Sequence, residues 1–426
     1  MEKKYSAKNG VAVYSYPNPT LNSFNISLYI KAGYIYESEE ERGISHFLEH
    51  VLIRNINELM GGTLYPTLDR TGLELGAYTY PEMIQLSVQG ARERFSLGGE
   101  IITRALLPIT LSSSHVDTER RRIKAEIRES DDKNTLSYLA SSTVHEGTPL
   151  AGSILGTNRT VDRITRTRLE KYRQRVISQE NIFFYLTGSY TEEELASFTE
   201  LVGSFSVSPT ECGQIRTTTV PVSANFGRRE PTVVVKSSDY TAAHFSFDVD
   251  MTRASACELD LIESILFSGF SAPFFVRMSE ESGLVYDVSG GIERYRNIAT
   301  LTFSFEVDSR KLETAIQMCV DILNAFINKP LSEGECMKAP YVDNAPLLLD
   351  SARELNFTFA YENHISGLGY PSVEARRRAY LAVSPEDITR CAGEIFRPEN
   401  LTLAIKGNKK KIDTERIRNI LLRIGE

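Results

Sequence analysis

The most informative stretch of this chain is His46-Phe47-Leu48-Glu49-His50, an H-x-x-E-H pattern in a segment whose sequence predicts a helix. His46, Glu49 and His50 are spaced i, i+3 and i+4, so a helix places them on one face. Two imidazoles four residues apart can bind one zinc ion, and a carboxylate on the same face can reach a water at the metal's open position. The stretch therefore predicts a zinc site that activates water.

A short pattern of this kind also arises by chance, and a single helical histidine is usually solvated or a hydrogen-bonding core residue. The chain contains only 6 His in 426 residues, and two of them fall within these five positions. This clustering favours a metal site. The reversed order of the better-known H-E-x-x-H pattern indicates a zinc peptidase.

Length and composition describe an ordinary globular protein of two domains, with 41% hydrophobic and 24% charged residues. The net charge of −8 argues against nucleic acid or an anionic membrane as the main partner. No run of 18 apolar residues is present, so we expect no transmembrane helix. The 5 Cys are scattered, which predicts reduced thiols and a cytoplasmic location.

An internal repeat supports two domains. Glu180-Asn181-Ile182 and Glu399-Asn400-Leu401 each precede an apolar strand and a glycine, and the two asparagines are 219 residues apart. Duplicated domains would each end with this strand, although two short strands can also match by chance. We expect domains at 1–210 and 230–426, joined by a linker at 211–229 that is rich in Ser, Thr, Pro and Gly.

Each half mixes expected strands and helices, with hairpins among them. Val11 to Tyr16 and Phe24 to Lys31 alternate as strands do. Glu39 to Arg54 is expected to be a helix with a capping box from Ser38 and Glu41, although Gly43 is an alternative start. We therefore predict an α+β fold of two homologous domains, each a mixed, mainly antiparallel sheet flanked by helices.

A zinc site with two histidines needs a third protein ligand. The charged helix expected from Val116 to Glu129 offers four carboxylates. Two of them, Glu119 and Glu126, are seven residues apart and share a face, so one can bind the metal while the other orients a ligand histidine. The alternative is a solvated face of paired charges. The residues alone do not choose among these carboxylates.

The segment from Gly43 to Arg54 reads GISHFLEHVLIR, and its first eight residues resemble the G-x-x-H-F-L-E-H pattern of the insulinase-type (M16) zinc peptidases. In that family the third ligand follows the second histidine by about 76 residues, which is the position of Glu126. Glu119 matches a glutamate that supports a ligand histidine. The resemblance continues in Gly147-Thr148-Pro149-Leu150 and in Ile154-Leu155-Gly156-Thr157.

The resemblance implies one Zn²⁺ per chain, held by His46, His50 and Glu126 in the N-terminal domain, and a homologous substrate-binding domain after it. It also implies that Glu49 is the general base of peptide hydrolysis. Two alternatives remain: a non-catalytic subunit of the same fold that binds peptides or scaffolds a protease, and Mn²⁺ in the same site.

Two departures from the family pattern concern the substrate. The family's substrate-binding edge strand carries an Asn-Ala-x-Thr motif, and the matching stretch here is Gly76-Ala77-Tyr78-Thr79, so the Asn is missing. The family's second domain also carries an Arg and a Tyr seven residues apart. Tyr286 matches the Tyr, but Ser279 stands where the Arg is expected, and Arg277 is two residues away.

A serine cannot replace the guanidinium fork that grips a carbonyl or carboxylate. The missing Arg therefore favours a heterodimer in which this chain supplies the zinc and a second M16-like subunit supplies the Arg–Tyr pair. A homodimer in which Arg277 compensates is the alternative. By analogy with related heterodimers, the substrate is expected to be a short or unfolded peptide precursor.

Overall fold

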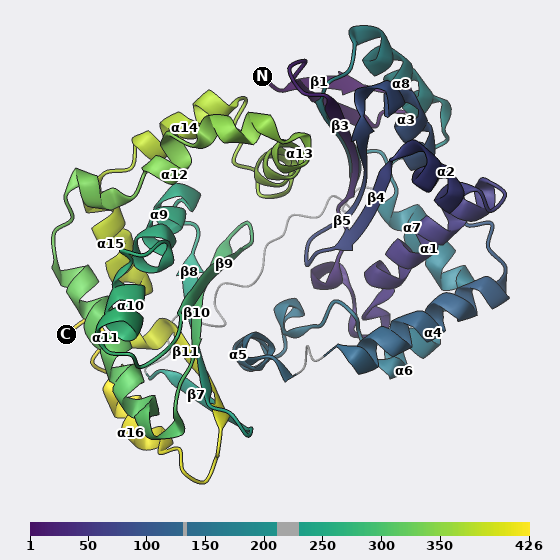
Figure 1. Cartoon of the computed structure of the whole chain (residues 1–426). Coiled ribbons are helices and arrows are strands. Elements are labelled where there is room, and N and C mark those ends of the chain that lie inside the picture. The colour runs from purple at the N-terminus through teal and green to yellow at the C-terminus, as the bar shows by residue number, and fades with distance from the viewer. Residues whose placement is uncertain (131–133, 211–229) are drawn as a thin grey trace. The chain divides into compact units, whose positions relative to one another are not determined.

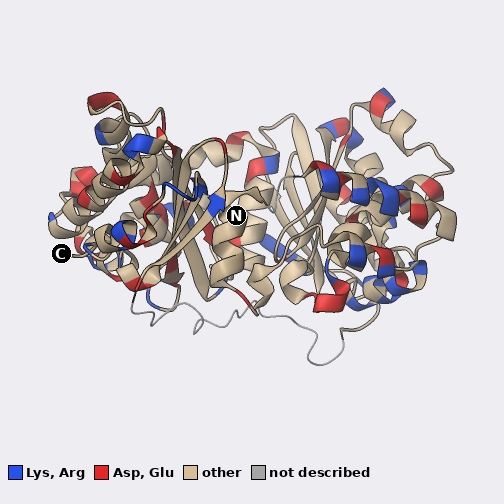
Figure 2. Cartoon of the chain, turned by 90° about the horizontal axis from the view of Figure 1, so that it is seen from below, with Lys and Arg blue, Asp and Glu red and all other residues tan. Residues whose placement is uncertain are grey.

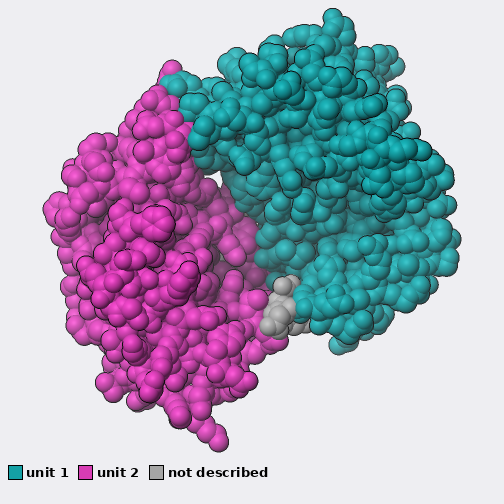
Figure 3. Space-filling view, viewed as in Figure 1, with its two compact units in different colours: residues 1–131, 152–218, 345–376 teal, residues 132–151, 219–344, 377–426 magenta. Residues whose placement is uncertain are grey.

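The computed structural model describes residues 1–130, 134–210 and 230–426. Its contacts divide the chain into two compact units (Figure 3). Unit 1 contains residues 1–131, 152–218 and 345–376, and unit 2 contains residues 132–151, 219–344 and 377–426. The predicted two-domain α+β architecture with mixed sheets is confirmed.

Unit 1 is built on a six-stranded sheet with the order β1-β2-β6-β3-β5-β4 (Figure 1). Its strands are β1 (Lys3–Ser6), β2 (Ala12–Pro17), β3 (Ser23–Ile30), β4 (Glu74–Thr79), β5 (Ile84–Ala91) and β6 (Ile182–Gly188). Only β2 and β6 pair in parallel; the other neighbours are antiparallel. Strand β4 therefore ends the sheet, and its outer edge has no strand partner among the described residues.

Helices cover both faces of this sheet. They are α1 (Ile44–Leu59), α2 (Leu64–Thr71), α3 (Phe95–Thr103), α4 (Ser113–Glu129), α6 (Asn158–Arg163), α7 (Arg166–Val176), α8 (Glu192–Ser204) and α13 (Ala352–Ala360). The alternating side chains of β3 separate the faces. Ile26 and Leu28 enter the core beneath α1 and α3, whereas Tyr29 faces α13 and donates its hydroxyl to Asn356 Oδ1 at 2.9 Å.

Unit 2 repeats this plan with a five-stranded sheet in the order β7-β11-β8-β10-β9. Its strands are β7 (Thr232–Ser237), β8 (Ala242–Asp250), β9 (Ser289–Arg294), β10 (Ile298–Glu306) and β11 (Leu401–Gly407). Its helices are α5 (Leu136–Val144), α9 (Ala256–Phe267), α10 (Pro273–Phe275), α11 (Leu312–Asn328), α12 (Ala339–Val342), α15 (Pro385–Ile395) and α16 (Thr414–Leu421), while α14 (Val373–Leu381) is shared by both units.

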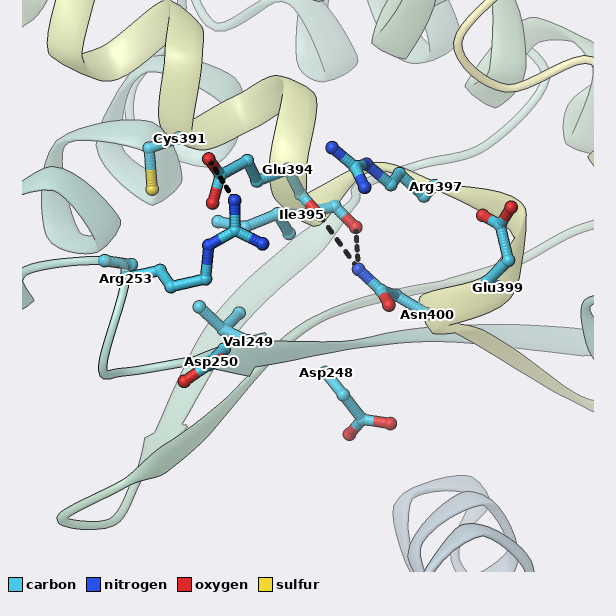
Figure 4. Close-up of a pocket in the computed structure, with 11 residues that line it drawn as sticks. Asp248, Val249, Asp250, Arg253, Cys391, Glu394, Ile395, Arg397, Glu399 and Asn400 are labelled. Atoms are coloured by element: carbon cyan, nitrogen blue, oxygen red, sulfur yellow. Dashed lines mark hydrogen bonds and ion pairs between the residues drawn. The ribbon is translucent and has the colours of Figure 1, made fainter. Parts of the chain in front are cut away.

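The predicted repeat is visible in strand order and in one hydrogen bond. The parallel pair β7/β11 in unit 2 corresponds to β2/β6 in unit 1, and the antiparallel neighbours follow in the same order. Asn181 Nδ2 donates to Val176 O at 2.7 Å, and Asn400 Nδ2 donates to Ile395 O at 3.1 Å (Figure 4). Each Asn thus satisfies a carbonyl at the end of the preceding helix, where no helical partner exists.

The compact units differ from the two halves of the sequence in two segments. Helix α5, from the first half, packs on β8 and β11 of unit 2. Helix α13, from the second half, packs on β3 and β6 of unit 1. Each sheet therefore buries its second face under a helix contributed by the other half. The expected linker at 211–229 lies outside the described residues, so the boundaries at 210 and 230 stay predictions.

The expected helix over Glu39 to Arg54 begins later than its capping-box pattern indicates. Residues Glu39–Glu41 form a short 3-10 turn, and α1 starts at Ile44 with Gly43 as its N-cap. Gly43 adopts a φ of 90°, which only glycine accepts without strain. The alternative start at Gly43 is therefore the correct one, and the capping-box start is wrong because the chain reverses at this glycine.

Charged residues of both signs are distributed over the helices of both units (Figure 2). The four cysteines in the described part of the chain are buried thiols outside disulfide bonds, and all lie in unit 2; Cys212 is outside the described residues. Within the same residues, no helix combines the length and apolar character needed to cross a bilayer.

The repeated asparagine generates a stability prediction. Replacing Asn181 or Asn400 by Ala leaves buried backbone carbonyls unpaired, so each change is expected to lower the free energy of unfolding of its own unit by about 1–3 kcal/mol. Urea unfolding followed by circular dichroism measures this change. The control is Asn158→Ala, an exposed position on α6. Equal stability of all three variants would contradict the structural role assigned to the repeat.

Candidate metal centre

Helix α1 carries the H-x-x-E-H pattern on the face that points away from its apolar side. Phe47, Leu48 and Val51 are fully buried in the core of unit 1. This packing fixes the rotation of the helix, so the three polar residues of the pattern lie together beside α4. The core contacts therefore position the candidate ligands before any metal is bound.

The start of α1 is fixed by a buried carboxylate and by two close glycines. Glu37 accepts hydrogen bonds from the backbone N–H groups of Gly43 and Ser45, both at 2.8 Å, and so caps the helix. A Cβ on Gly43 would lie 2.7 Å from Leu155 O, and one on Gly156 would lie 2.4 Å from Arg42 O. The segment that resembled the family after residue 150 thus packs directly against the first turn of the metal helix.

Helix α4 presents the candidate third ligand. Val116 and Ile123 anchor it in the core, and Glu119 and Glu126 follow on the face toward α1. Glu119 is 0% exposed, whereas the Glu126 side chain is 44% exposed. The two carboxylates that the sequence left as alternatives therefore have different environments: one is enclosed by protein and the other is accessible.

His46, His50 and Glu126 come together as one cluster whose ligand atoms all lie within 4.8 Å of one another. The Nε2 atoms of His46 and His50 are each 3.6 Å from an oxygen of Glu126. Ligands at about 2.0–2.1 Å from a tetrahedral zinc lie roughly 3.3–3.4 Å apart, so this donor set fits zinc with small adjustments. No second cluster of this kind occurs among the described residues.

The protonation of His46 also suits a metal ligand. Burial, followed by the neighbouring His50, lowers the pKa of His46 to about 3. Its imidazole is therefore neutral near pH 7, which is the form that donates a lone pair to a metal. The two imidazole rings stand at 77° to each other with centroids 4.7 Å apart, so both can direct a nitrogen to the same point.

Glu119 supports the cluster from behind His50. Its Oε2 lies 3.4 Å from His50 Nδ1, the nitrogen that does not face Glu126. Arg54 and Arg122 donate to the same carboxylate at 2.5 and 2.9 Å. Burial opposes ionisation of Glu119, but the bonds from His50 and the two arginines prevail and lower its pKa to about 2. The ionised carboxylate fixes the ring orientation of His50.

Glu49 lies on the same face of α1 and is not one of the cluster's ligands. Thr79 donates its hydroxyl to Glu49 Oε2 at 2.6 Å. Burial, with a further contribution from the nearby charge of Glu126, raises the pKa of Glu49, while the bond from Thr79 opposes this rise. The carboxylate is therefore held beside the three ligand side chains by a residue of the edge strand β4.

The predicted substrate-binding residues fall in both units. Gly76, Ala77 and Tyr78 lie on β4, at the open edge of the unit 1 sheet. Tyr286 lies in a loop of unit 2 and is 95% exposed. Strand β4, which carries three of these residues, also carries Thr79, whose hydroxyl bonds to Glu49.

The position of the missing arginine is occupied by a structural serine. Ser279 Oγ donates to the backbone carbonyl of Tyr286 at 2.8 Å and closes the loop between them. Arg277 lines a cavity of unit 2 with Ile322 and others, whereas Tyr286 lines a different cavity. Arg277 therefore does not take the place that an Arg seven residues before Tyr286 would have.

The sequence did not identify two residues that support the candidate site, Arg54 and Thr79. Arg54 follows His50 by four residues, so its place on the same helical face was available as a signal. Thr79 stood in the quoted Gly76-Ala77-Tyr78-Thr79 stretch, but its contact with Glu49 depends on the packing of β4 against α1, which no local pattern encodes.

Comparison with known proteins agrees with this geometry. The family model described as insulinase, peptidase family M16, matches residues 12–158, and the model described as peptidase M16 inactive domain matches residues 163–339. An uncharacterized zinc protease of Rickettsia felis is 23% identical over 401 residues, covering 91% of this chain and 93% of that protein. Cytochrome b-c1 complex subunit 1 of Caenorhabditis elegans is 27% identical over 169 residues, 39% of this chain and 36% of that protein.

The crystal structure of a protease from Helicobacter pylori superposes with a TM-score of 0.82 at 17% identity, covering 96% of this chain and 99% of that chain. At this identity the likeness concerns the fold alone. Both family models, the zinc protease relatives and the fold lead to one conclusion: the chain belongs to the M16 (insulinase) family of peptidases.

Proposed function

We propose that this chain is a zinc-dependent endopeptidase that hydrolyses short or unfolded peptides, with one Zn²⁺ per chain held by His46, His50 and Glu126. The observation that carries the proposal is the position of Glu49. Its carboxylate lies on the same helical face as two candidate ligands and is held there by Thr79. A carboxylate that is beside a metal site but outside its ligand set can serve as a general base.

Zinc, when bound, lowers the pKa of a coordinated water and polarises a carbonyl group. Glu49 would accept the proton that the attacking water loses and deliver it to the leaving amine. The hydroxyl of Thr79 donates to Glu49 Oε2 and would hold the carboxylate in position for this transfer. Glu119, locked between two arginines, would keep His50 in one orientation throughout.

Strand β4 offers a way to hold a peptide beside these groups. Its outer edge has no strand partner in the described sheet, so an extended peptide can add to it by main-chain hydrogen bonds. A segment without its own tertiary structure adopts that extended conformation without first having to unfold. This requirement supports short or unfolded peptides as substrates.

The proposed assembly is a heterodimer with a second M16-like subunit. Ser279 bonds to the carbonyl of Tyr286, and Arg277 lines a separate cavity, so the chain itself lacks the expected Arg–Tyr arrangement. A partner subunit with that pair would complete substrate binding. The alternative of a self-sufficient homodimer predicts high turnover by the purified chain alone.

A second candidate function is a non-catalytic subunit of the same fold. The likeness to a cytochrome b-c1 complex subunit favours it, because that relative is named for a complex and not for proteolysis. The match of residues 163–339 to a domain described as inactive concerns only the segment after the metal ligands. An intact ligand set together with Glu49 supports the enzyme over the scaffold.

The first prediction concerns the general base. In Glu49→Gln, zinc content should stay at one ion per chain, while kcat/KM for a quenched, unstructured peptide should fall by at least about 10²–10⁴-fold. The assay uses the chain alone and the chain reconstituted with an M16-like subunit that carries the Arg–Tyr pair.

Glu58→Gln is the matched control, because Glu58 lies on the same helix with an exposed side chain. Full activity of Glu49→Gln would refute the mechanism. Stoichiometric zinc without hydrolysis in either assay would favour the non-catalytic subunit.

The second prediction concerns metal affinity. Glu119→Gln removes the charge that orients His50, so the zinc dissociation constant should rise about 10–100-fold. Competition with a chromophoric chelator measures it, and circular dichroism checks that the variant is folded. Glu129→Gln, at the exposed end of the same helix, serves as control. Unchanged affinity in a folded Glu119→Gln variant would contradict the supporting role of Glu119.

A further inference from the structure

A cavity of about 490 Å³ lies in unit 1 between the edge of the sheet and helix α13. Its walls come from two strands and one helix, and the lining residues are Tyr78, Tyr80, Gln85, Ser87, Arg353, Glu354, Phe357 and Thr358. Apart from Tyr78, a predicted substrate-binding residue, the lining residues have no assigned role in the candidate metal centre. The position of the cavity beside β4 nevertheless connects it to that centre.

Strand β4 links the two through the alternation of its side chains. Thr79 points to one face of the sheet and bonds Glu49 on α1. Tyr78 points to the opposite face, where its hydroxyl accepts a hydrogen bond from Arg353 Nη2 of α13 at 3.2 Å. Adjacent residues of one edge strand thus contact the general base on one face and the cavity on the other.

The glycine that replaced the expected Asn shapes this cavity. A Cβ on Gly76 would lie 3.0 Å from Ser87 Oγ and 3.1 Å from the Cε2 atom of Tyr78. The ring of Tyr78 therefore leans over the space that a side chain at position 76 would fill. The departure at Gly76 and the position of Tyr78 are two parts of one arrangement.

Arg353 supplies a cation to this cavity. In the described part of the chain its one hydrogen bond goes to the neutral phenol of Tyr78, and no carboxylate lies within ion-pair distance. Glu354 lines the same cavity, but it is in the first turn of α13, where a negative charge is stabilised by the helix N-terminus. The guanidinium of Arg353, in contrast, donates a hydrogen bond to Tyr78 of β4, the strand that would bind a peptide.

We infer that this cavity is a side-chain subsite of the peptide-binding edge and that Arg353 selects an acidic residue of the peptide there. The inference deepens the proposed function and rests on it only in taking the ligand to be a peptide extended along β4. A strand added to that edge sends alternate side chains to the α13 face, with the side chain opposite Tyr78 about 4.5–5.5 Å away.

The chemistry of the lining suits a Glu or Asp side chain. Tyr80 and Phe357, with ring centroids 5.5 Å apart, form an aromatic wall for the methylene groups. The carboxylate would meet Arg353 and the hydroxyl of Tyr78. A charge-assisted bond of this kind is roughly twice as strong as a neutral one, so it can discriminate between Glu and Gln.

Binding to the zinc-loaded Glu49→Gln chain tests the inference without hydrolysis. The probes are fluorescent, unstructured peptides in which each position in turn is Glu, Gln or Lys, and anisotropy gives the dissociation constant. At one position Glu should bind about tenfold more tightly than Gln. Adding Arg353→Gln should remove this preference, and adding Arg353→Glu should reverse it in favour of Lys.

Glu354→Gln is the matched control on the same helix and should keep the preference for Glu. Loss of the preference in Glu354→Gln with its survival in Arg353→Gln would overturn the inference, as would equal binding of all three peptides at every position. Circular dichroism establishes that each variant is folded.

Hydrolysis by chains that keep Glu49, with and without Arg353→Gln, separates this inference from the proposed function; each chain is assayed alone and with an M16-like subunit that carries the Arg–Tyr pair. Cleavage that shows no dependence on Arg353 in kcat/KM sinks the inference and leaves the peptidase intact. Charge-dependent binding without cleavage in either assay supports the inference and contradicts the proposed peptidase activity.

Discussion

The contact between helices α1 and α4 is the constraint on which the candidate centre depends, and the buried carboxylate of Glu119 is its centre. A fully buried charge is costly unless it is paired and hydrogen-bonded. Here Arg54 from α1 and Arg122 from α4 both bond to it, and His50 lies against it. These bonds join the two helices in the register that also brings the candidate ligand atoms together.

The packing of α1 satisfies its apolar face and its polar face at the same time. One side of α1 packs in the core through Phe47, Leu48 and Val51, and the other side contacts α4. The glycine contact between Gly43 and the segment at Gly156 fixes where the helix begins. Rotation, register and start are thus determined by three separate interactions, which leaves the cluster little freedom before metal binds.

The sequence predicted the elements that have a strong local period and the site residues that share a helix. The pattern from His46 to His50 and the spacing of Glu119 and Glu126 both depend on a single helix, so each could be found without the fold. The assignment of Glu126 as ligand and Glu119 as support needed the family resemblance, because the two differ in burial, which spacing does not encode.

What the sequence could not show are the contacts between distant segments. The bonds from Thr79 to Glu49 and from Arg353 to Tyr78 join residues 30 and 275 positions apart. The placement of α13 on the sheet of the first half likewise follows from an exchange of helices between the halves, and no composition shift marks it. The predicted start of α1 was wrong for a local reason. Ser38 and Glu41 match a capping box, but they precede Gly43, where the chain turns.

We propose that His46, His50 and Glu126 bind one zinc ion. X-ray absorption spectroscopy at the zinc edge of the purified chain, together with total metal analysis, measures this binding. We expect one zinc per chain with only nitrogen and oxygen ligands at about 2.0–2.1 Å, including two imidazoles. Sulfur ligands at about 2.3 Å, or zinc that is absent from a folded chain after loading, would contradict it.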